Sequence, residues 1–221
     1  MVQILIRNFF IGSYAILCFS VFCVQANAVH APVLIADSNG NHEIPLLTGK
    51  SAQIEKSILD YLLKHMHGVS QKKASKLARL ILNLSKKHDF HPRLILSIIH
   101  VESSFQPWAV SRQGALGLMQ VMPETGEWLA KRIGMKWTGP AMLFDEKVNL
   151  ALGVRYLVYL RKKYHGDLKK MLSAYNQGPG KVDIDMAKGR GLALAYYHRV
   201  QQHLQAGALK KNNLAQEVYV D

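Results

Sequence analysis

The sequence predicts a mainly α-helical fold, and three observations lead to this prediction. Apolar residues recur at intervals of three and four over most of residues 51–206, whereas alternating strand patterns are nearly absent. Hydrophobic residues make up 49% of the chain and charged residues 19%, which is the composition of a globular protein rather than a disordered one. With 221 residues the chain is long enough for about one domain. We therefore expect one compact helical domain over residues 71–206.

Residues 1–28 have the features of a secretory signal peptide. Arg7 precedes an apolar run over residues 9–24, and Ala26-Asn27-Ala28 then supplies the small residues of a signal peptidase site. An uncleaved membrane anchor is the alternative, because the apolar run is only slightly too short for a spanning helix. Cleavage would remove Cys18 and Cys23, the only cysteines of the chain. We therefore expect an exported protein that uses neither a thiol nor a disulfide.

Residues 29–70 are predicted to form an N-terminal extension that becomes helical along its length. Proline, glycine and asparagine recur without a sustained period up to about residue 50, which favours an extended lead-in. From Ser51 onward, apolar residues follow a helical spacing: Ile54, Ile58, Tyr61 and Leu62.

The predicted domain itself consists of helices and one long loop. Residues 71–87 place apolar side chains on one face and lysines off it, and Pro92 begins another helix where proline is tolerated. Residues 106–123 are rich in Gly, Pro and Ser, which predicts a structured loop. Helical periodicity returns in four segments: 124–133, 146–164, 168–176 and 192–206. A C-terminal tail, residues 207–221, completes the predicted organisation.

Glu102 is a candidate functional residue because it continues an apolar helical face. It lies four residues after Ile98 and three after Ile99, on a helix that must end before Pro107. Apolar surroundings and a helix C-terminus both disfavour the ionised carboxylate, so both raise its pKa. A carboxyl that stays protonated near neutral pH is suited to general acid catalysis. The position alone is also compatible with an alternative, in which Glu102 is half-exposed at the helix end or pairs with a basic group.

The residues that follow Glu102 belong to a longer pattern. Residues 102–123 read E-S-S-F-Q-P-W-A-V-S-R-Q-G-A-L-G-L-M-Q-V-M-P, and three blocks follow in order: N-L-A-L-G-V-R-Y-L at 149–157, A-Y-N-Q-G-P-G at 174–180 and Y-Y-H-R-V at 196–200. The chain resembles the lytic transglycosylases of the soluble, goose-lysozyme-like kind. Their pattern E-S-x-F-x-x-x-A-x-S-x-x-G-A-x-G-L-M-Q-x-M-P is filled here at every fixed position. The resemblance covers about residues 75–205 and implies a lysozyme-like (SLT) helical domain.

The resemblance implies an enzyme that cuts the β-1,4 bond between N-acetylmuramic acid and N-acetylglucosamine in peptidoglycan. Glu102 would be its catalytic residue, first protonating the glycosidic oxygen and then taking the proton of the muramic acid 6-hydroxyl. A 1,6-anhydro sugar would form without water. The family's substrate-binding positions fall on Ser111, Gly117, Leu118, Met119, Gln120, Tyr175, Asn176 and Tyr196.

Simpler structural roles exist for some of these side chains. The resemblance gives Ser111 the task of orienting the catalytic carboxyl, but a serine there can also stabilise its own loop. Met119 can equally be a core residue. The tryptophans Trp108, Trp128 and Trp137 are candidates to stack on sugar rings, although packing in the core or at its rim is the simpler expectation for each.

Two other functions stay open: a lysozyme-type muramidase that uses water, and a wall-binding scaffold protein without catalysis. The absence of Asp and Glu between Glu102 and Glu124 favours chemistry with one carboxyl over the pair that most glycosidases use. No convincing ligand set accompanies the histidines, and His100-x-Glu102 lacks the paired cysteines of a zinc deaminase. We therefore expect neither a metal nor another cofactor.

The charge of the chain bears on its partners. It has 28 Lys and Arg against 15 Asp and Glu, a formal net charge of +13. This excess suits the carboxylates of peptidoglycan stems, so glycan strands in the periplasm or cell wall are the expected partner. Cell-envelope or secretion-machinery proteins are further candidates. Nucleic acid and, after signal cleavage, an integral membrane span are not expected.

We expect binding to purified peptidoglycan sacculi to weaken as salt rises, because salt screens the attraction between the basic protein and the stem carboxylates. Co-sedimentation at increasing NaCl concentrations, up to about 0.5 M, measures this effect. Unchanged binding across the titration would contradict the electrostatic argument.

Overall fold

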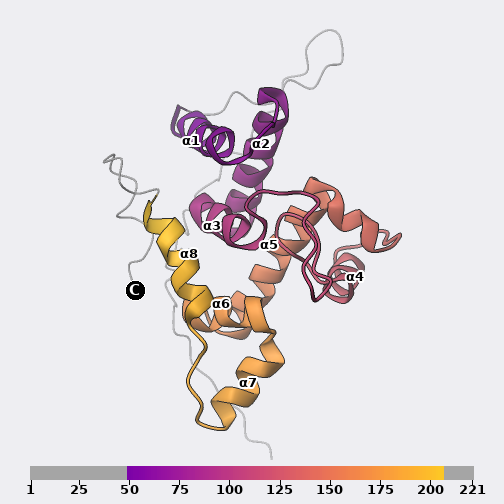
Figure 1. The fold of residues 1–221 in the computed structure, drawn as a ribbon, viewed down its shortest axis with the longest axis vertical. Coiled ribbons are helices and arrows are strands. Elements are labelled where there is room, and N and C mark those ends of the chain that lie inside the picture. The colour runs from indigo at the N-terminus through magenta and orange to yellow at the C-terminus, as the bar shows by residue number, and fades with distance from the viewer. Residues whose placement is uncertain (1–48, 207–221) are drawn as a thin grey trace, which may run out of the picture. The chain divides into compact units, whose positions relative to one another are not determined.

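The structure, a computed structural model, describes residues 49–206, most of which lie in nine helical elements (Figure 1). They are α1 (Gly49–His65), α2 (Gln71–His88), α3 (Pro92–Ser103), α4 (Pro123–Arg132), the 3₁₀ helix η1 (Pro140–Phe144), α5 (Glu146–Lys163), α6 (Leu168–Gln177), α7 (Pro179–Ala187) and α8 (Ala195–Ala206). The described residues include no β-strand, only two isolated bridges in the loop between α3 and α4. The prediction of a mainly α-helical chain is confirmed.

The predicted bounds agree closely with the observed helices. The predicted segments 71–87, 146–164 and 168–176 differ from α2, α5 and α6 by one residue at one end, and 124–133 differs from α4 by one residue at each end. α8 begins at Ala195, three residues later than predicted. The predicted signal peptide and C-terminal tail lie outside the described residues.

Two elements, η1 and α7, were not predicted. α7 carries no apolar stripe, because Val182 is buried while Ile184 and Met186 are exposed. Its start follows Gly178, whose φ of 85° ends the previous helix, and Pro179 occupies the first turn, where proline is tolerated. Hydrophobic periodicity therefore gives no signal for this helix, although its start has the expected residues.

Local side-chain contacts explain where several helices begin. Ser70 accepts a hydrogen bond from the backbone of Lys73 at the start of α2, and Asp145 and Asp167 do the same at the starts of α5 and α6. Such caps pair backbone N–H groups that have no partner within the helix. α3 and α4 begin with a proline in the first turn, which loses no helical hydrogen bond there, and at α3 the His91 side chain also accepts from Arg93 N.

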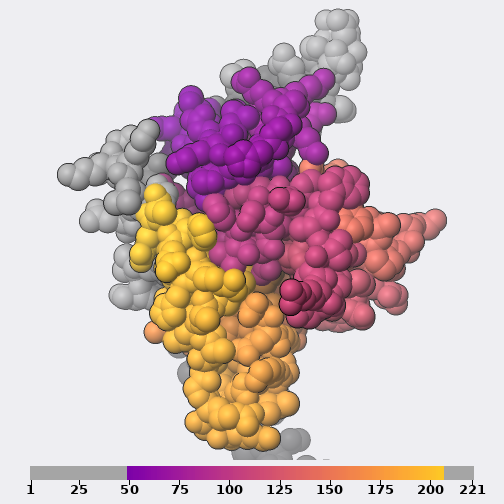
Figure 2. Space-filling model, in the orientation of Figure 1, coloured from indigo at the N-terminus to yellow at the C-terminus, as the bar shows by residue number. Residues whose placement is uncertain are grey.

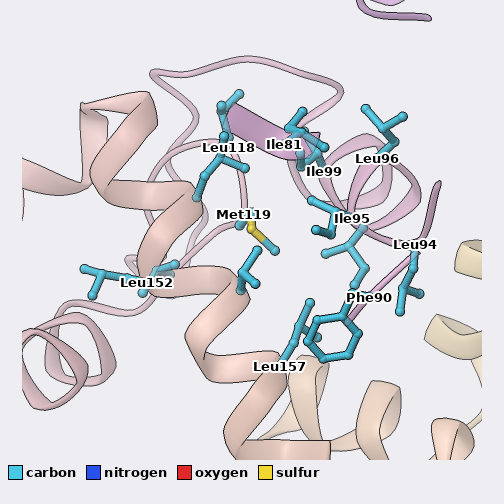
Figure 3. Close-up of a cluster of buried hydrophobic side chains, with 14 of the residues drawn as sticks. Ile81, Phe90, Leu94, Ile95, Leu96, Ile99, Leu118, Met119, Leu152 and Leu157 are labelled. Carbon is cyan, nitrogen blue, oxygen red and sulfur yellow. The ribbon is translucent and has the colours of Figure 1, made fainter. Parts of the chain in front are cut away.

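The core is built around α3 and α5. Every residue from Leu94 to Ile99 is buried, so α3 is enclosed on all sides, as expected for a helix without a polar face. Figure 3 shows Ile95 and Ile99 of α3 in one cluster with Leu157 of α5 and with Met119 of the loop before α4. The two central helices thus hold that loop from its inner side.

α1 belongs to the same core. Ile58, Leu62 and the following Met66 are buried in the hydrophobic cluster, and α1 packs along α2. The compact body of the described chain therefore starts before residue 71, where the sequence places the domain boundary. Within residues 49–206 none of the helices combines the length and hydropathy that a bilayer span requires.

Asn149 of α5 anchors the loop between α3 and α4. Its side chain is fully buried, accepts a hydrogen bond from Met119 N at 2.7 Å, and donates to the carbonyls of Leu116 and Leu143 at 2.8 Å each. Gly117 lies directly over this side chain with φ of 76°, and a Cβ at this position would overlap both Leu143 O and the Asn149 amide. Only glycine fits there, because it combines this backbone conformation with this close approach.

We expect Asn149→Ala to lower the free energy of unfolding by about 3 kcal/mol, because it leaves three buried backbone groups without partners. Urea unfolding followed by circular dichroism measures the change. Asn83→Ala, an amide on the exposed face of α2, is the matched control and should alter stability by less than about 0.5 kcal/mol. Equal effects of the two substitutions would refute an anchoring role for Asn149.

Candidate active site

The carboxyl of Glu102 lies in the last turn of α3, where α8 packs against this helix. Figure 2 shows α8 in yellow directly beside the magenta region that includes α3. The phenol of Tyr196 on α8 donates a hydrogen bond of 2.5 Å to Glu102 Oε1. α3 ends immediately afterwards, because Ser104 adopts a left-handed conformation with φ of 48°. The structure thus brings together two predicted site residues that are far apart in the sequence.

The surroundings of Glu102 favour its protonated form. Burial raises the pKa of this carboxyl from 4.5 to about 7, whereas the hydrogen bond from Tyr196 and the charge of Arg199 act in the opposite direction. Burial prevails because a charge loses more hydration energy than these two contacts return. The prediction of a raised pKa agrees with this result. Near neutral pH the carboxyl can therefore both give and accept a proton.

Tyrosines from three helices form a layer beside Glu102. The rings of Tyr196 and Tyr175 are nearly parallel, with an interplanar angle of 14° and centroids 6.3 Å apart, and Tyr156 of α5 lies 5.5 Å from Tyr175. The Tyr175 hydroxyl donates to the carbonyl of Met119 at 2.9 Å. Burial raises the pKa of Tyr156 to about 12 and those of Tyr175 and Tyr196 well above 10. All three phenols therefore keep their protons, and those of Tyr175 and Tyr196 donate hydrogen bonds.

Three of the loop positions predicted to bind substrate, Gly117, Leu118 and Met119, face the interior of the protein. The side chains of Leu118 and Met119 have no exposed area, so they belong to the core and cannot offer a surface to a sugar. The close approach that Gly117 permits is to Leu143 and Asn149 rather than to open space. These three positions shape the loop from inside.

Ser111 and Gln120 use their side chains within the loop. The Ser111 hydroxyl accepts a hydrogen bond from Ala115 N at 2.9 Å, which is the loop-stabilising contact that the sequence left open. The Gln120 amide nitrogen donates to the carbonyls of Ala109 and Gly117, at 3.1 and 2.9 Å. Both protons of this amide are thereby used, so its oxygen is the group that can accept from a ligand.

Two hollows open near Glu102 on the described part of the chain. One, of about 370 Å³, brings together the predicted residues Gln120, Tyr175 and Asn176. The other, of about 530 Å³, is lined by Ser104 and Phe105, two and three residues after Glu102 in the chain. No Asp or Glu is among the described residues that line either hollow, and residues 49–206 include no group of His, Cys, Asp or Glu arranged to hold a metal ion.

Three residues near the site were not predicted from the sequence as site residues. The guanidinium of Arg199 lies over the Tyr196 ring, 5.6 Å from its centroid. Ser103, the residue after Glu102, donates its hydroxyl to Leu118 O at 2.8 Å and so joins the end of α3 to the loop. The third is Asn149. Each belongs to one of the sequence blocks quoted above, but a block does not say which of its members make structural contacts.

Comparisons with known proteins place this geometry in a family. A family model described as "Transglycosylase SLT domain" matches residues 79–193. The curated protein "Membrane-bound lytic murein transglycosylase C" of Edwardsiella ictaluri is 37% identical over 133 residues, which cover 56% of this chain and 37% of the relative. Its counterpart in Serratia proteamaculans is 37% identical over 120 residues, covering 50% and 34%. The chain thus spans little more than a third of the length of these relatives.

Solved structures show the same fold. The 70 kDa soluble lytic transglycosylase of Escherichia coli matches with a TM-score of 0.50 and 23% identity, over 72% of this chain and 28% of that one. A complex of the 70 kDa enzyme with bulgecin A matches with a TM-score of 0.51 over the same shares. The expected lysozyme-like helical fold of this family is thereby confirmed.

We expect Glu102→Gln to stabilise the protein at about pH 8 and to change its stability little at about pH 4. A carboxyl whose pKa rises from 4.5 to about 7 on folding holds its proton more tightly in the folded state, so stability falls as the pH rises between these values. The loss corresponds to about 3 kcal/mol above pH 7. Glutamine carries no charge and can still accept the hydrogen bond from Tyr196.

Urea unfolding at several pH values measures this difference. Glu127→Gln is the matched control, because Glu127 forms an exposed pair with Lys131 on α4. If the stability of Glu102→Gln depended on pH as that of the control does, the carboxyl would not carry a raised pKa.

Proposed function

The chain belongs to the transglycosylase SLT domain family, and from this premise we propose that it is a peptidoglycan lytic transglycosylase. It would cleave the β-1,4 bond between N-acetylmuramic acid and N-acetylglucosamine and leave a 1,6-anhydro end. The curated relatives bear the name of lytic murein transglycosylases. Because the chain spans little more than a third of their length, their activity supports the proposal without establishing it here.

One observation supports this function best. The Glu102 carboxyl accepts a hydrogen bond from Tyr196, and burial brings its pKa to about 7. The proposed reaction needs one group that gives a proton in its first half and takes one in its second. A carboxyl with a pKa near the ambient pH performs both tasks without a large energetic cost for either.

In the first half of the reaction Glu102 protonates the oxygen of the scissile glycosidic bond. The bond between this oxygen and C1 of N-acetylmuramic acid breaks, and the N-acetylglucosamine leaves with a free 4-hydroxyl. Positive charge then develops at C1 while Glu102 becomes a carboxylate, whose negative charge stabilises the oxocarbenium-like centre.

In the second half the 6-hydroxyl of the same N-acetylmuramic acid attacks C1. Glu102 takes the proton of this hydroxyl, which returns the carboxyl to its starting form and closes the 1,6-anhydro ring. No water enters, and all atoms of the substrate are found in the two products. The absence of Asp and Glu from the described linings of both hollows favours this route over a muramidase, which needs a second group to activate water or attack the sugar.

The other predicted site residues receive roles consistent with their contacts. Tyr196 is a positioning residue, because its hydroxyl fixes the orientation of Glu102. The Gln120 oxygen can accept from a sugar hydroxyl or acetamido N–H, and Asn176 is exposed at the same hollow. Ser111, Gly117, Leu118 and Met119 would contribute through the shape of the loop.

The cellular setting is part of the proposal. The relatives are named as membrane-bound murein enzymes, which supports a place in the cell envelope. The predicted signal peptide at residues 1–28 would direct the chain to the periplasm or cell wall. Glycan strands are the proposed partner, and envelope or secretion-machinery proteins are further candidates.

We expect Glu102→Gln to reduce digestion of purified sacculi by at least about a thousandfold, because the proton donor is lost. Mass spectrometry of products from the unsubstituted protein should give muramic ends that lack one water relative to hydrolysed ends. Above about pH 7 the rate should fall about tenfold per pH unit, since only protonated Glu102 can start the reaction.

Glu127→Gln again serves as the control and should digest sacculi normally. Hydrolysed ends would identify a muramidase instead, and unimpaired digestion by Glu102→Gln would exclude Glu102 as the acid. If the unsubstituted protein bound sacculi without releasing any product, the scaffold alternative would replace the proposed enzyme.

A further inference from the structure

The hollow of about 530 Å³ that Ser104 and Phe105 line has two walls from separate parts of the chain. One wall is the segment 104–108, which begins two residues after Glu102. The other consists of residues 65–70, at the end of α1 and in the turn before α2, together with Lys73. This second wall precedes residues 79–193, the part of the chain that matches the family model. The quoted family motifs begin at Glu102, so they do not specify that residues 65–70 face the segment 104–108 across a hollow.

Trp108 is the most exposed aromatic residue of this hollow. Its relative exposure is 72%, although a tryptophan side chain normally loses much of its surface on folding. The ring lies against Phe144 of η1, with centroids 5.3 Å apart and an interplanar angle of 33°. Phe144 supports the indole while most of its surface stays accessible. Such a ring is already oriented before any ligand arrives, which lowers the entropic cost of binding.

The other two tryptophans differ from Trp108. Trp128 is mostly buried, with the edge of Tyr159 against it at 5.0 Å and the Arg132 guanidinium over its ring. Trp137 packs beside Gly126 at the rim of the core. The expectation of core or rim packing therefore holds for these two rings but does not account for Trp108.

The groups around Trp108 suit an uncharged polar ligand. Ser70 and Gln106 line the same hollow and are exposed, so a hydroxyl and an amide are available for hydrogen bonds. The nearest permanent positive charge, that of Lys73, is already paired with Glu146 at 2.7 Å. Its charge is largely compensated, so the hollow has no strong preference for an anion. Apolar contact from Trp108 with polar groups around it fits a sugar ring, which has C–H faces and a hydroxyl rim.

We propose that this hollow is a glycan subsite that holds one N-acetylhexosamine of the substrate strand, with the sugar ring stacked on Trp108. The inference rests on the proposed function, because the subsite is placed on a peptidoglycan strand that is cleaved at Glu102. The α1–α2 turn closes the subsite, so α1 contributes to substrate binding as well as to the core. A strand bound at Glu102 would pass over Ser104 and Phe105 into this subsite.

Binding of β-1,4-linked N-acetylglucosamine hexamer to the Glu102→Gln protein tests the subsite without catalysis. Adding Trp108→Ala should weaken the affinity about tenfold in isothermal titration calorimetry, whereas Trp108→Phe should retain most of it, because a ring remains. Ile184→Ala removes another exposed apolar side chain, on α7, and should bind as the parent does. The affinity should not depend on salt, because the hexamer carries no charge.

Activity on soluble glycan strands gives a second readout. In the protein with an intact Glu102, Trp108→Ala should raise the KM about tenfold and change the kcat less than about threefold, because the ring does not touch the reacting atoms. Thermal unfolding should show Trp108→Ala and Trp108→Phe to be as stable as the parent, since the side chain is exposed.

The outcomes separate the two proposals. Hexamer binding that is unchanged in Trp108→Ala, or equally weakened in Trp108→Phe, would overturn the subsite even if sacculi are digested. Binding that falls with added salt would also overturn it, since an ionic contact would then dominate. Trp108-dependent binding by a protein that digests no sacculi would leave the subsite standing and refute the proposed function.

Discussion

The hydrogen bond between Tyr196 and Glu102 is the contact on which the site depends. It joins α3 to α8 across 94 residues of sequence, at the end of a helix whose preceding turns are enclosed by apolar side chains. A carboxyl there loses hydration, and the phenol is the direct partner that the structure gives it in exchange. The Tyr196 donor and the charge of Arg199 compensate part of this loss, and the remainder keeps the pKa of Glu102 raised.

A second constraint acts on the loop between α3 and α4. Phe105, Leu118 and Met119 of this loop are buried in the core, but apolar packing is non-directional and does not by itself fix the path of the backbone. Asn149 holds it with three hydrogen bonds, Gly117 allows the backbone to reach that amide, and Ser103 ties Leu118 to the end of α3. The buried polar contacts therefore determine the path of the chain, whereas the buried leucines and methionines supply most of the stability.

Much of the fold followed from the sequence because most helices carry an apolar stripe or a capping residue. α7 has no such stripe, so periodicity missed it. Glu102 was recognised from its apolar face, a local property. The Tyr196 contact could be expected only through the family resemblance, since local patterns do not say which distant segments meet. Burial of Leu118 was missed, and that of Met119 was only one of two alternatives, for a related reason: the motif names positions near the site but does not say which way each side chain points.

The absence of a second carboxyl from the described linings of the two hollows and the raised pKa of Glu102 are linked by the same physics. A second carboxylate within a few ångströms of Glu102 would raise this pKa further through repulsion, and the ionised form needed for the second half of the proposed reaction would become costly. A fully solvated carboxyl, with a pKa near 4.5, would rarely be protonated when substrate arrives. The pKa of Glu102, which is largely buried and accepts a hydrogen bond from one phenol, lies between these two extremes. The fold thus reaches a pKa near neutrality by enclosing one acid at a helix end, and in the proposed reaction the substrate's own hydroxyl then takes the place of a second catalytic group.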